Sequence, residues 1–330
     1  MISLVEVRAA GVKQRDRSTT LRAEEVRFQR TDVVLAGTFL APPDAKAAAL
    51  ILTGSGPLDR DANSPRFRSR ISLAIAQALA GHGVASLRYD KRGAGQSQGD
   101  YFATGLTENY ADARTAADWL RDRCPDLLTY ALGHSEGALH AAHLAAEAKI
   151  AGAVLIACPA RRGEEILTWQ AAQIVPTLPP VTQALLRILR IDPLKSQCKA
   201  FTRLRSTSAN AIRIQGKKVN ARWLRQFMDY DPAPVFQLIH VPLLVLIGEH
   251  DMQVPPEDAD TIRTLVKGPC DEHVLEGISH ILRPDPESRG PRAYRKALRE
   301  EVSPLLLSAI TGWIDEQVRP FHVEITERAR

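Results

Sequence analysis

Short apolar runs alternate with amphipathic segments along most of the chain. The runs have the length of buried strands, and the segments between them repeat apolar positions every three to four residues, as helices do. We predict strands over residues 47–53, 84–89, 127–132, 153–157, 241–247 and 270–275, and helices over 71–80, 110–123, 138–146 and 257–267, with a closing helix inside 292–317. This alternation predicts an α/β fold: a mostly parallel central sheet flanked by helices, with right-handed crossovers.

The pattern differs at the N-terminus. Residues 21–41 alternate apolar and polar positions on either side of a break near Thr31-Asp32, which predicts an antiparallel hairpin at a sheet edge. Residues 1–20 are mixed in character and are predicted to form a loosely held leader, in which residues 2–7 could add an edge strand.

The alternation stops between the two halves of the predicted core, residues 21–159 and 236–330. Residues 160–235 are polar, helix-like and interrupted by prolines, and we predict that they fold over the site as a helical cap. The large apolar side chains of this insertion either line an acyl pocket or form the cap's own core, and the core is favoured for any single one. They are Trp169, Trp223, Phe227 and Met228.

Composition narrows the function classes. The 330 residues are 45% hydrophobic and 25% charged, as in ordinary globular proteins. The net charge of +5 comes from basic residues scattered among acids, so no nucleic-acid partner is expected. The chain shows neither a signal peptide nor a run long enough to span a membrane, which predicts a cytoplasmic location and no membrane partner.

Four cysteines without a C-x-x-C pair predict free, mostly buried thiols: Cys124, Cys158, Cys198 and Cys270.

The candidate chemistry centres on Gly133-His134-Ser135-Glu136-Gly137, a G-x-S-x-G motif between a predicted strand and a predicted helix. That context is the one a nucleophile elbow needs. The two glycines relieve crowding around a serine in a strained backbone conformation, so the Ser135 hydroxyl projects from the strand end. The N–H of Glu136, at the helix start, can then point to where an oxyanion forms.

Two more candidates directly follow strands. Asp251 comes after the fifth predicted strand and His280 after the last. Because sites in parallel sheets form beyond the carboxyl ends of the strands, Ser135, Asp251 and His280 are predicted to meet there. Their roles would be nucleophile, orienting acid and general base.

A glycine-rich turn follows the first predicted central strand. Its free backbone N–H groups supply a candidate second oxyanion donor, Ser55 or Gly56, beside that of Glu136. The side chain of Glu136 has two open roles, since it could fix a loop or bind a substrate amine. Glu164 and Glu165 are the fallback acid if Asp251 fails.

The other histidines near these motifs are weaker candidates. His140 and His143 lie three apart on a helix, but no third metal ligand is apparent, so packing or surface roles are favoured and no metal is expected. The side chain of His134 is expected to point away from the nucleophile. His250 lies too close in sequence to Asp251 to reach over the serine.

These residues resemble the α/β-hydrolase superfamily, in which nucleophile, acid and histidine occur in this order. The nearest branch is that of bacterial esterases and serine-aminopeptidase-like hydrolases related to the dienelactone hydrolases. The resemblance spans roughly residues 21–320 and rests on the segments Gly54-Ser55-Gly56-Pro57 with Asp59-Arg60-Asp61, Arg88-Tyr89-Asp90-Lys91-Arg92-Gly93, the elbow, Gly248-Glu249-His250-Asp251 with Gln253-Val254-Pro255, and the cap segment from Trp223 to Phe227 with Tyr230-Asp231-Pro232. One departure is Thr53-Gly54 at a place where the family commonly has His-Gly, which leaves the anchoring of that loop open.

The expected function is a serine hydrolase of carboxylic esters, with thioesters or small amides as further substrates, acting without a cofactor through an acyl-enzyme on Ser135. A peptidase, aminopeptidase or acyltransferase on the same residues is the first alternative. A non-catalytic ligand-binding member of the fold is the second. The expected partner is a small-molecule ester or amide, and the sequence does not fix the oligomeric state.

Overall fold

The computed structural model of the protein describes residues 21–285, 287 and 290–328. The predicted leader, with its possible edge strand, lies outside these residues. The described part is built around one eight-stranded sheet with the order β1-β2-β6-β3-β7-β8-β11-β12. Its strands are β1 (Arg22–Arg30), β2 (Val33–Ala41), β3 (Ala47–Leu52), β6 (Val84–Tyr89), β7 (Thr129–His134), β8 (Gly152–Ile156), β11 (Leu243–His250) and β12 (Cys270–Ser279).

The sheet is parallel except at one edge. β1 and β2 form the predicted antiparallel hairpin, and β2 pairs antiparallel with β6; from β6 to β12 all neighbours are parallel. The predicted strands and their mostly parallel arrangement are therefore confirmed. The last strand runs four residues further than predicted, to Ser279, and so ends next to His280.

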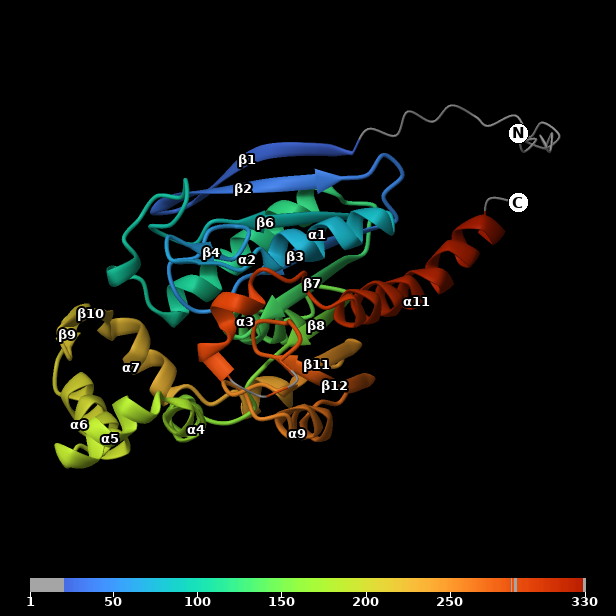
Figure 1. The fold of residues 1–330 in the computed structure, drawn as a ribbon. Coiled ribbons are helices and arrows are strands. Elements are labelled where there is room, and N and C mark those ends of the chain that lie inside the picture. The colour runs from blue at the N-terminus through green and yellow to red at the C-terminus, as the bar shows by residue number, and fades with distance from the viewer. Residues whose placement is uncertain (1–20, 286, 288–289, 329–330) are drawn as a thin grey trace, which may run out of the picture.

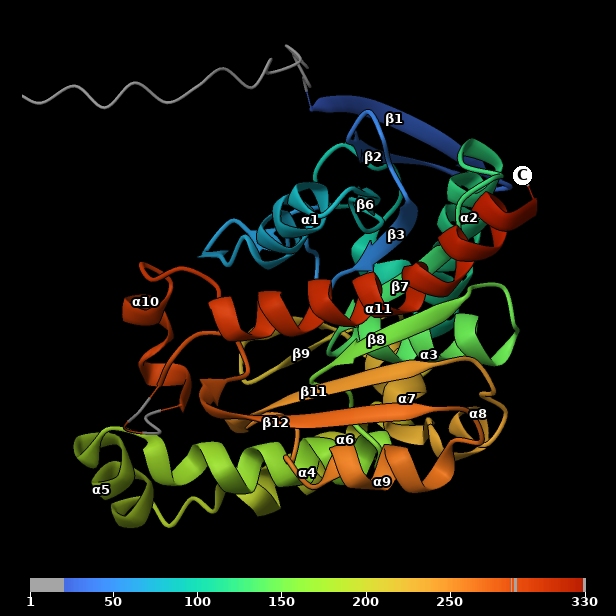
Figure 2. The same cartoon turned by 90° about the vertical axis from the view of Figure 1, so that its right-hand side faces the viewer.

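Helices cover both faces of the sheet, as Figures 1 and 2 show. On one face, α1 (Ile71–Gly81) and α11 (Pro304–Arg328) pack on alternate strand residues, and the predicted inward side chains Trp313 and Ile314 are buried there. The other face packs against α2 (Leu106–Arg123), α3 (Glu136–Ala146) and α9 (Asp258–Leu265). Two apolar layers, one on each side of the central strands, make up the core.

The segment between β8 and β11 forms a helical unit at one end of the sheet (Figure 1). It consists of α4 (Gly163–Ile174), α5 (Pro180–Ile188), α6 (Pro193–Arg205), α7 (Ala221–Asp229), α8 (Ala233–Phe236) and a hairpin of β9 (Ala211–Ile214) and β10 (Lys217–Asn220). The hairpin was not predicted. Phe201, Leu204 and Met228 form a small core of this unit's own.

Short elements complete the described chain. They are β4 (Asn63–Ser64), β5 (Phe67–Arg68), α10 (Tyr294–Ala297) and the 3₁₀ turns Tyr101–Ala103, Val175–Thr177 and Gly290–Arg292. None of the described helices contains a stretch long and apolar enough to cross a lipid bilayer. All four cysteines are free thiols, as predicted, but only Cys158 is fully buried and Cys198 is exposed, so the prediction of mostly buried thiols was wrong.

Candidate active site

Ser135 occupies the sharp turn between β7 and α3. Its backbone has φ 56° and ψ −119°, a conformation that a non-glycine residue adopts only under strain. The crowding is measurable: a Cβ added to Gly133 would lie 2.1 Å from the carbonyl oxygen of Gly137, and one added to Gly137 would lie 2.3 Å from that of Leu52. The local geometry of the elbow is therefore as the motif predicts.

Asp251 and His280 meet at the carboxyl ends of β11 and β12. The Nδ1 atom of His280 lies 2.8 Å from Oδ2 of Asp251, and both residues are buried. The other oxygen of Asp251 accepts hydrogen bonds from the N–H groups of Gln253 (2.7 Å) and Val254 (2.9 Å). Because a carboxylate only accepts, Nδ1 of the imidazole must donate, which leaves Nε2 of a neutral ring with a free lone pair.

Ser135 and His280 line the same cavity, whose volume is about 380 Å³. Across the described residues, no hydrogen bond joins the Ser135 hydroxyl to the His280 ring. Such contacts are often long in unliganded enzymes and tighten when substrate binds. The structure thus bonds the acid to the histidine and places the serine in the cavity that the histidine lines.

The candidate oxyanion donors lie in the same cavity. Ser55 and Glu136 both contribute to its wall, and a Cβ built on Gly54 would lie 3.5 Å from the Cβ of Ser135, so the loop after β3 runs directly beside the elbow. Glu136 is the first residue of α3, where the N–H has no partner one turn earlier in the helix.

The carboxylate of Glu136 is buried and bonded on Oε1. It accepts hydrogen bonds from Nζ of Lys91 (3.0 Å), Nδ2 of Asn109 (2.7 Å) and Nε2 of His140 (3.1 Å). Burial alone would raise the pKa of Glu136, but the charge of Lys91 and the hydrogen bond from His140 outweigh it and bring the pKa to about 2. Among the two roles left open by the sequence, these contacts favour fixing a loop.

His134 does not point away from the site as predicted. Its ring lies 4.9 Å from that of His280, and its Nε2 donates to the backbone oxygen of His280 at 2.9 Å. Burial and the neighbouring His280 lower the pKa of His134 to about 3, so its ring is neutral. The prediction was wrong: His134 is the last residue of β7, and its side chain lines the cavity together with Ser135.

The weaker candidates have other contacts. His143 bonds to the hydroxyl of Tyr230 (3.0 Å), and Nδ1 of His250 bonds to the backbone oxygen of Asp285 (2.6 Å). The fallback acids Glu164 and Glu165 line a different hollow, on the outside of α4. In the described part of the chain, no three His, Cys, Asp or Glu side chains gather in a way that could hold a metal ion.

Two stacked aromatic rings of the helical unit form part of the cavity wall. Trp223 and Phe227 of α7 stack with 4.8 Å between ring centroids and 10° between planes, and both line the cavity. Met228 instead lies in the core of the cap unit, and Trp169 lines the outer hollow of α4. A place in the core of the 160–235 segment itself, the role favoured from the sequence, is confirmed for Met228 alone. Trp223 and Phe227 line the cavity and pack with the main core beneath the sheet, and Trp169 belongs to neither core.

Two polar residues of the site were missed. Lys91 lay within a segment quoted for the family resemblance but received no role, and Asn109 lies near the start of α2 without any motif around it. The signal for Lys91 was its place after β6, at the sheet edge where the other candidates gather. Asn109 gave no signal in the sequence.

Comparison with known proteins relates this architecture to hydrolases. The family model described as serine aminopeptidase, S33, matches residues 68–287. Esterase EstD of Thermotoga maritima is 24% identical over 269 residues, 81% of this chain, and the chain spans only 61% of that relative's length.

Solved structures with the same fold include a protein bound to ferulic acid and a proline iminopeptidase. Est1E of Butyrivibrio proteoclasticus, bound to ferulic acid, superposes with a TM-score of 0.60 at 18% identity, covering 89% of this chain and 99% of that one. Proline iminopeptidase of Mycobacterium smegmatis gives a TM-score of 0.59 at 14% identity, covering 90% and 99%. At these identities the likeness shows the α/β-hydrolase fold alone.

Proposed function

Because the chain belongs to the serine aminopeptidase, S33, family of α/β-hydrolases, we propose that it is a serine esterase. The observation that carries this proposal is the bonded pair of His280 and Asp251 in the wall of the cavity that also contains the strained Ser135. A serine hydroxyl is a weak nucleophile unless an adjacent base takes its proton.

In the proposed mechanism, Nε2 of His280 takes the proton of Ser135 as the hydroxyl oxygen attacks the ester carbonyl. Asp251 holds the ring in the tautomer with hydrogen on Nδ1 and stabilises the imidazolium that forms. His280 then gives the proton to the leaving alcohol, and an acyl-enzyme remains on Ser135. Water, deprotonated by the same histidine, then attacks the acyl carbon. The bond to the Ser135 oxygen breaks, that oxygen takes the proton back from His280, and the acid product leaves.

The negative charge that develops on the carbonyl oxygen needs donors that are already in place. We assign the backbone N–H groups of Glu136 and Ser55 to this role. Loss of one such donor lowers kcat roughly 10²–10³-fold in comparable sites. The oxyanion hole that these two N–H groups form therefore supplies a major part of the proposed rate enhancement.

The cavity favours esters over amino-terminal peptide substrates. Among the described residues that line it, Glu136 is the only carboxylate. Its Oε2 has no hydrogen-bond partner, but its Oε1 accepts from three groups and its charge is already paired with the buried ammonium of Lys91. An aminopeptidase needs an acidic group free to bind the substrate's ammonium. The apolar side of the cavity, where Trp223 and Phe227 stack, suits a small uncharged acyl group.

The test is a panel of p-nitrophenyl esters of increasing acyl length beside aminoacyl p-nitroanilides and an added alcohol acceptor. We expect hydrolysis of short esters, at rates far above those of the anilides. Ser135→Ala is expected to lower kcat roughly 10⁶-fold, whereas Ser308→Ala, an exposed serine of α11, keeps full activity. Faster cleavage of anilides would favour the peptidase, dominant acyl transfer to the alcohol the acyltransferase, and no turnover of any substrate the non-catalytic binder.

A further inference from the structure

Two strand ends meet behind the predicted oxyanion hole. The loop 54–61 follows β3, and residues 88–92 at the end of β6 pack against it. The carboxylate of Asp90 accepts from the backbone N–H of Arg60 (2.7 Å) and from its guanidinium (2.8 Å). The backbone N–H of Lys91 donates to a carbonyl of the loop at 3.1 Å. The main chain of the loop is thus fastened to β6 at two points.

The side chain of Lys91 makes a third and more specific contact. Its Nζ donates to the backbone oxygen of Gly54 (3.1 Å) as well as to Glu136 (3.0 Å). The oxygen of Gly54 and the N–H of Ser55 belong to the same peptide unit, which is trans and planar, so they point in opposite directions. An ammonium held on that oxygen therefore fixes where the N–H points, and it polarises the peptide toward stronger donation.

Glu136 links the second donor to the same ammonium. Its backbone N–H starts α3 beside the nucleophile, and its side chain binds Lys91 in a buried position, with Asn109 and His140 as further partners. The Lys91 and Glu136 residues are only 7% and 2% exposed, so water does not compete for these contacts. Lys91 thus contacts both the Gly54–Ser55 peptide and the side chain of Glu136, the two residues assigned as oxyanion donors.

We propose that Lys91 and the carboxylate of Glu136 are positioning residues that hold the two oxyanion donors, Ser55 N–H and Glu136 N–H, at a fixed separation and orientation. This inference rests on the proposed function. It also supplies an anchor for the loop at the point where Thr53 departs from the histidine common in the family.

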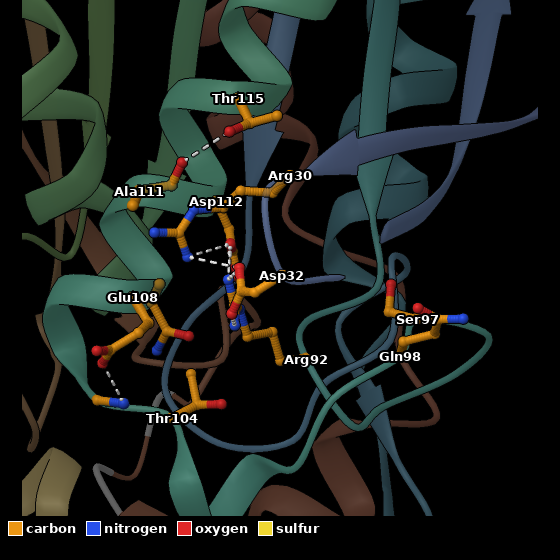
Figure 3. A network of polar contacts seen from close by, with 12 residues as sticks. Arg30, Asp32, Arg92, Ser97, Gln98, Thr104, Glu108, Ala111, Asp112 and Thr115 are labelled. Carbon is orange, nitrogen blue, oxygen red and sulfur yellow. Dashed lines mark hydrogen bonds and ion pairs between the residues drawn. The ribbon is translucent and has the colours of Figure 1, made fainter. Parts of the chain in front are cut away.

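The next residue, Arg92, serves as an internal contrast. Its guanidinium binds Asp112 of α2 (2.6 Å) and Asp32 in the β1–β2 turn (2.7 Å), as Figure 3 shows. None of these three side chains lines the cavity. A buried ion pair is therefore not enough for the positioning role that we propose. That role requires contact with the residues that carry the oxyanion donors, which Lys91 makes and Arg92 does not.

The experiment compares an ester with the matching thionoester, in which sulfur replaces the carbonyl oxygen. Sulfur accepts hydrogen bonds poorly, so the ratio of kcat/KM for the two substrates reports how well the hole stabilises an oxyanion. For Lys91→Met we expect kcat on the ester to fall roughly 30-fold, less than the loss of a whole donor, with KM little changed. The ester-to-thionoester ratio should fall about as much as kcat does.

Lys46→Met is the matched control. Lys46 also forms a partly buried ion pair, with Asp315 at 2.6 Å, but it lies outside the cavity. Both variants lose an ammonium and gain a thioether, and we expect the control to keep the wild-type ratio. Equal losses on ester and thionoester in Lys91→Met, with the ratio intact, would reduce Lys91 to a structural role and overturn the inference.

Two milder variants keep the test decisive if Lys91→Met does not fold. Glu136→Gln retains an acceptor for Lys91 but no charge, and Lys91→Arg retains the charge with a different donor geometry. The ratio is expected to fall in the order wild type, Lys91→Arg, Glu136→Gln, and a wild-type ratio in Glu136→Gln would refute the proposal. If wild-type protein hydrolyses no ester, the proposed function fails before this comparison begins.

Discussion

Lys91 and Arg92 are adjacent in the chain, both are buried, and each pairs with a buried carboxylate, yet they belong to different parts of the molecule. The ammonium of Lys91 reaches a peptide oxygen and a glutamate beside the nucleophile. The guanidinium of Arg92 joins α2 to the turn between β1 and β2 (Figure 3). The first cluster lies against the cavity, and the second lies between elements of the fold.

The difference teaches that the partner of a buried charge decides what its loss affects. Breaking either pair leaves a buried charge without compensation, which is costly in any location. Only the cluster at the cavity contacts the peptide unit and the residue that carry the proposed oxyanion donors. Substitutions in the two clusters should therefore separate activity from stability.

The largest effect is expected on kcat, from substitution of Asp251 in the cavity wall. Asp251→Asn should lower kcat about 10⁴-fold with folding kept, because an amide disfavours the imidazole tautomer that the base needs. Asp258→Asn is the control, since Asp258 is also a buried acid but accepts from the N–H of Ala160 (2.8 Å) outside the cavity. Steady-state kinetics of both variants decide the point, and near-wild-type turnover in Asp251→Asn removes the residue from the mechanism.

The second effect is on stability, in the other cluster. Arg92→Met should lower the free energy of unfolding by about 3–5 kcal/mol, because the buried carboxylate of Asp112 loses its shortest ion pair. Its kcat per folded molecule should stay within a factor of about three, as no contact with the cavity is lost. Arg30→Met removes a longer contact to Asp112 (3.4 Å) at the more exposed end of the cluster and should cost about 1 kcal/mol or less.

Denaturant titration monitored by tryptophan fluorescence, together with kinetics below the transition, measures both quantities for these arginine variants. A large kcat loss in folded Arg92→Met would erase the division between the two clusters. A wild-type free energy of unfolding in the same variant would remove its role in the fold.

The third comparison concerns a half-buried group with an uncharged hydrogen-bond partner, His143 on α3. Burial and the nearby His140 lower the pKa of His143 to about 4 from an ordinary 6.5. As the pH falls through 6.5, the unfolded chain takes up this proton and the folded protein does not, so stability is lost between pH 6.5 and 4. The contribution is about 1.4 kcal/mol per pH unit.

His143→Gln should make the pH dependence of the unfolding free energy shallower by that amount in this window. Tyr230→Phe is the control, because it removes the hydroxyl bonded to His143 at 3.0 Å but keeps the imidazole, and the slope should persist. An unchanged slope in His143→Gln would show that the imidazole is accessible to protons in the folded state.

Much of the core could be predicted because its signals are local. The short apolar strands are bounded by polar turns, and the elbow is specified within five residues, so strand and serine could be placed together. The predicted ends of helices and strands were wrong where the local sequence pattern and the packing of the fold disagree. α2 begins at Leu106 rather than residue 110. β12 continues past Leu275 through an irregularity at Glu276 and Gly277, and its pairing with β11 resumes between Ser279 and His250.

Contacts between distant segments were harder to predict. The bonds from Lys91 to Gly54 and Glu136 join residues 37 and 45 positions apart, and no periodicity encodes them. The β9–β10 hairpin did have a signal, since Gln215-Gly216 occupy positive φ of 49° and 78° at its turn. Its strands are only four residues long, so the proline-broken helical pattern around them dominated the prediction.

The central claim is that Ser135 is acylated, and intact-mass spectrometry with peptide mapping after a fluorophosphonate probe tests it most directly. We expect one adduct per chain, located on the peptide containing Ser135, absent from heat-denatured protein and strongly slowed by His280→Ala. An esterase that remains unlabelled at Ser135, or that carries its adduct on another residue, would contradict the account.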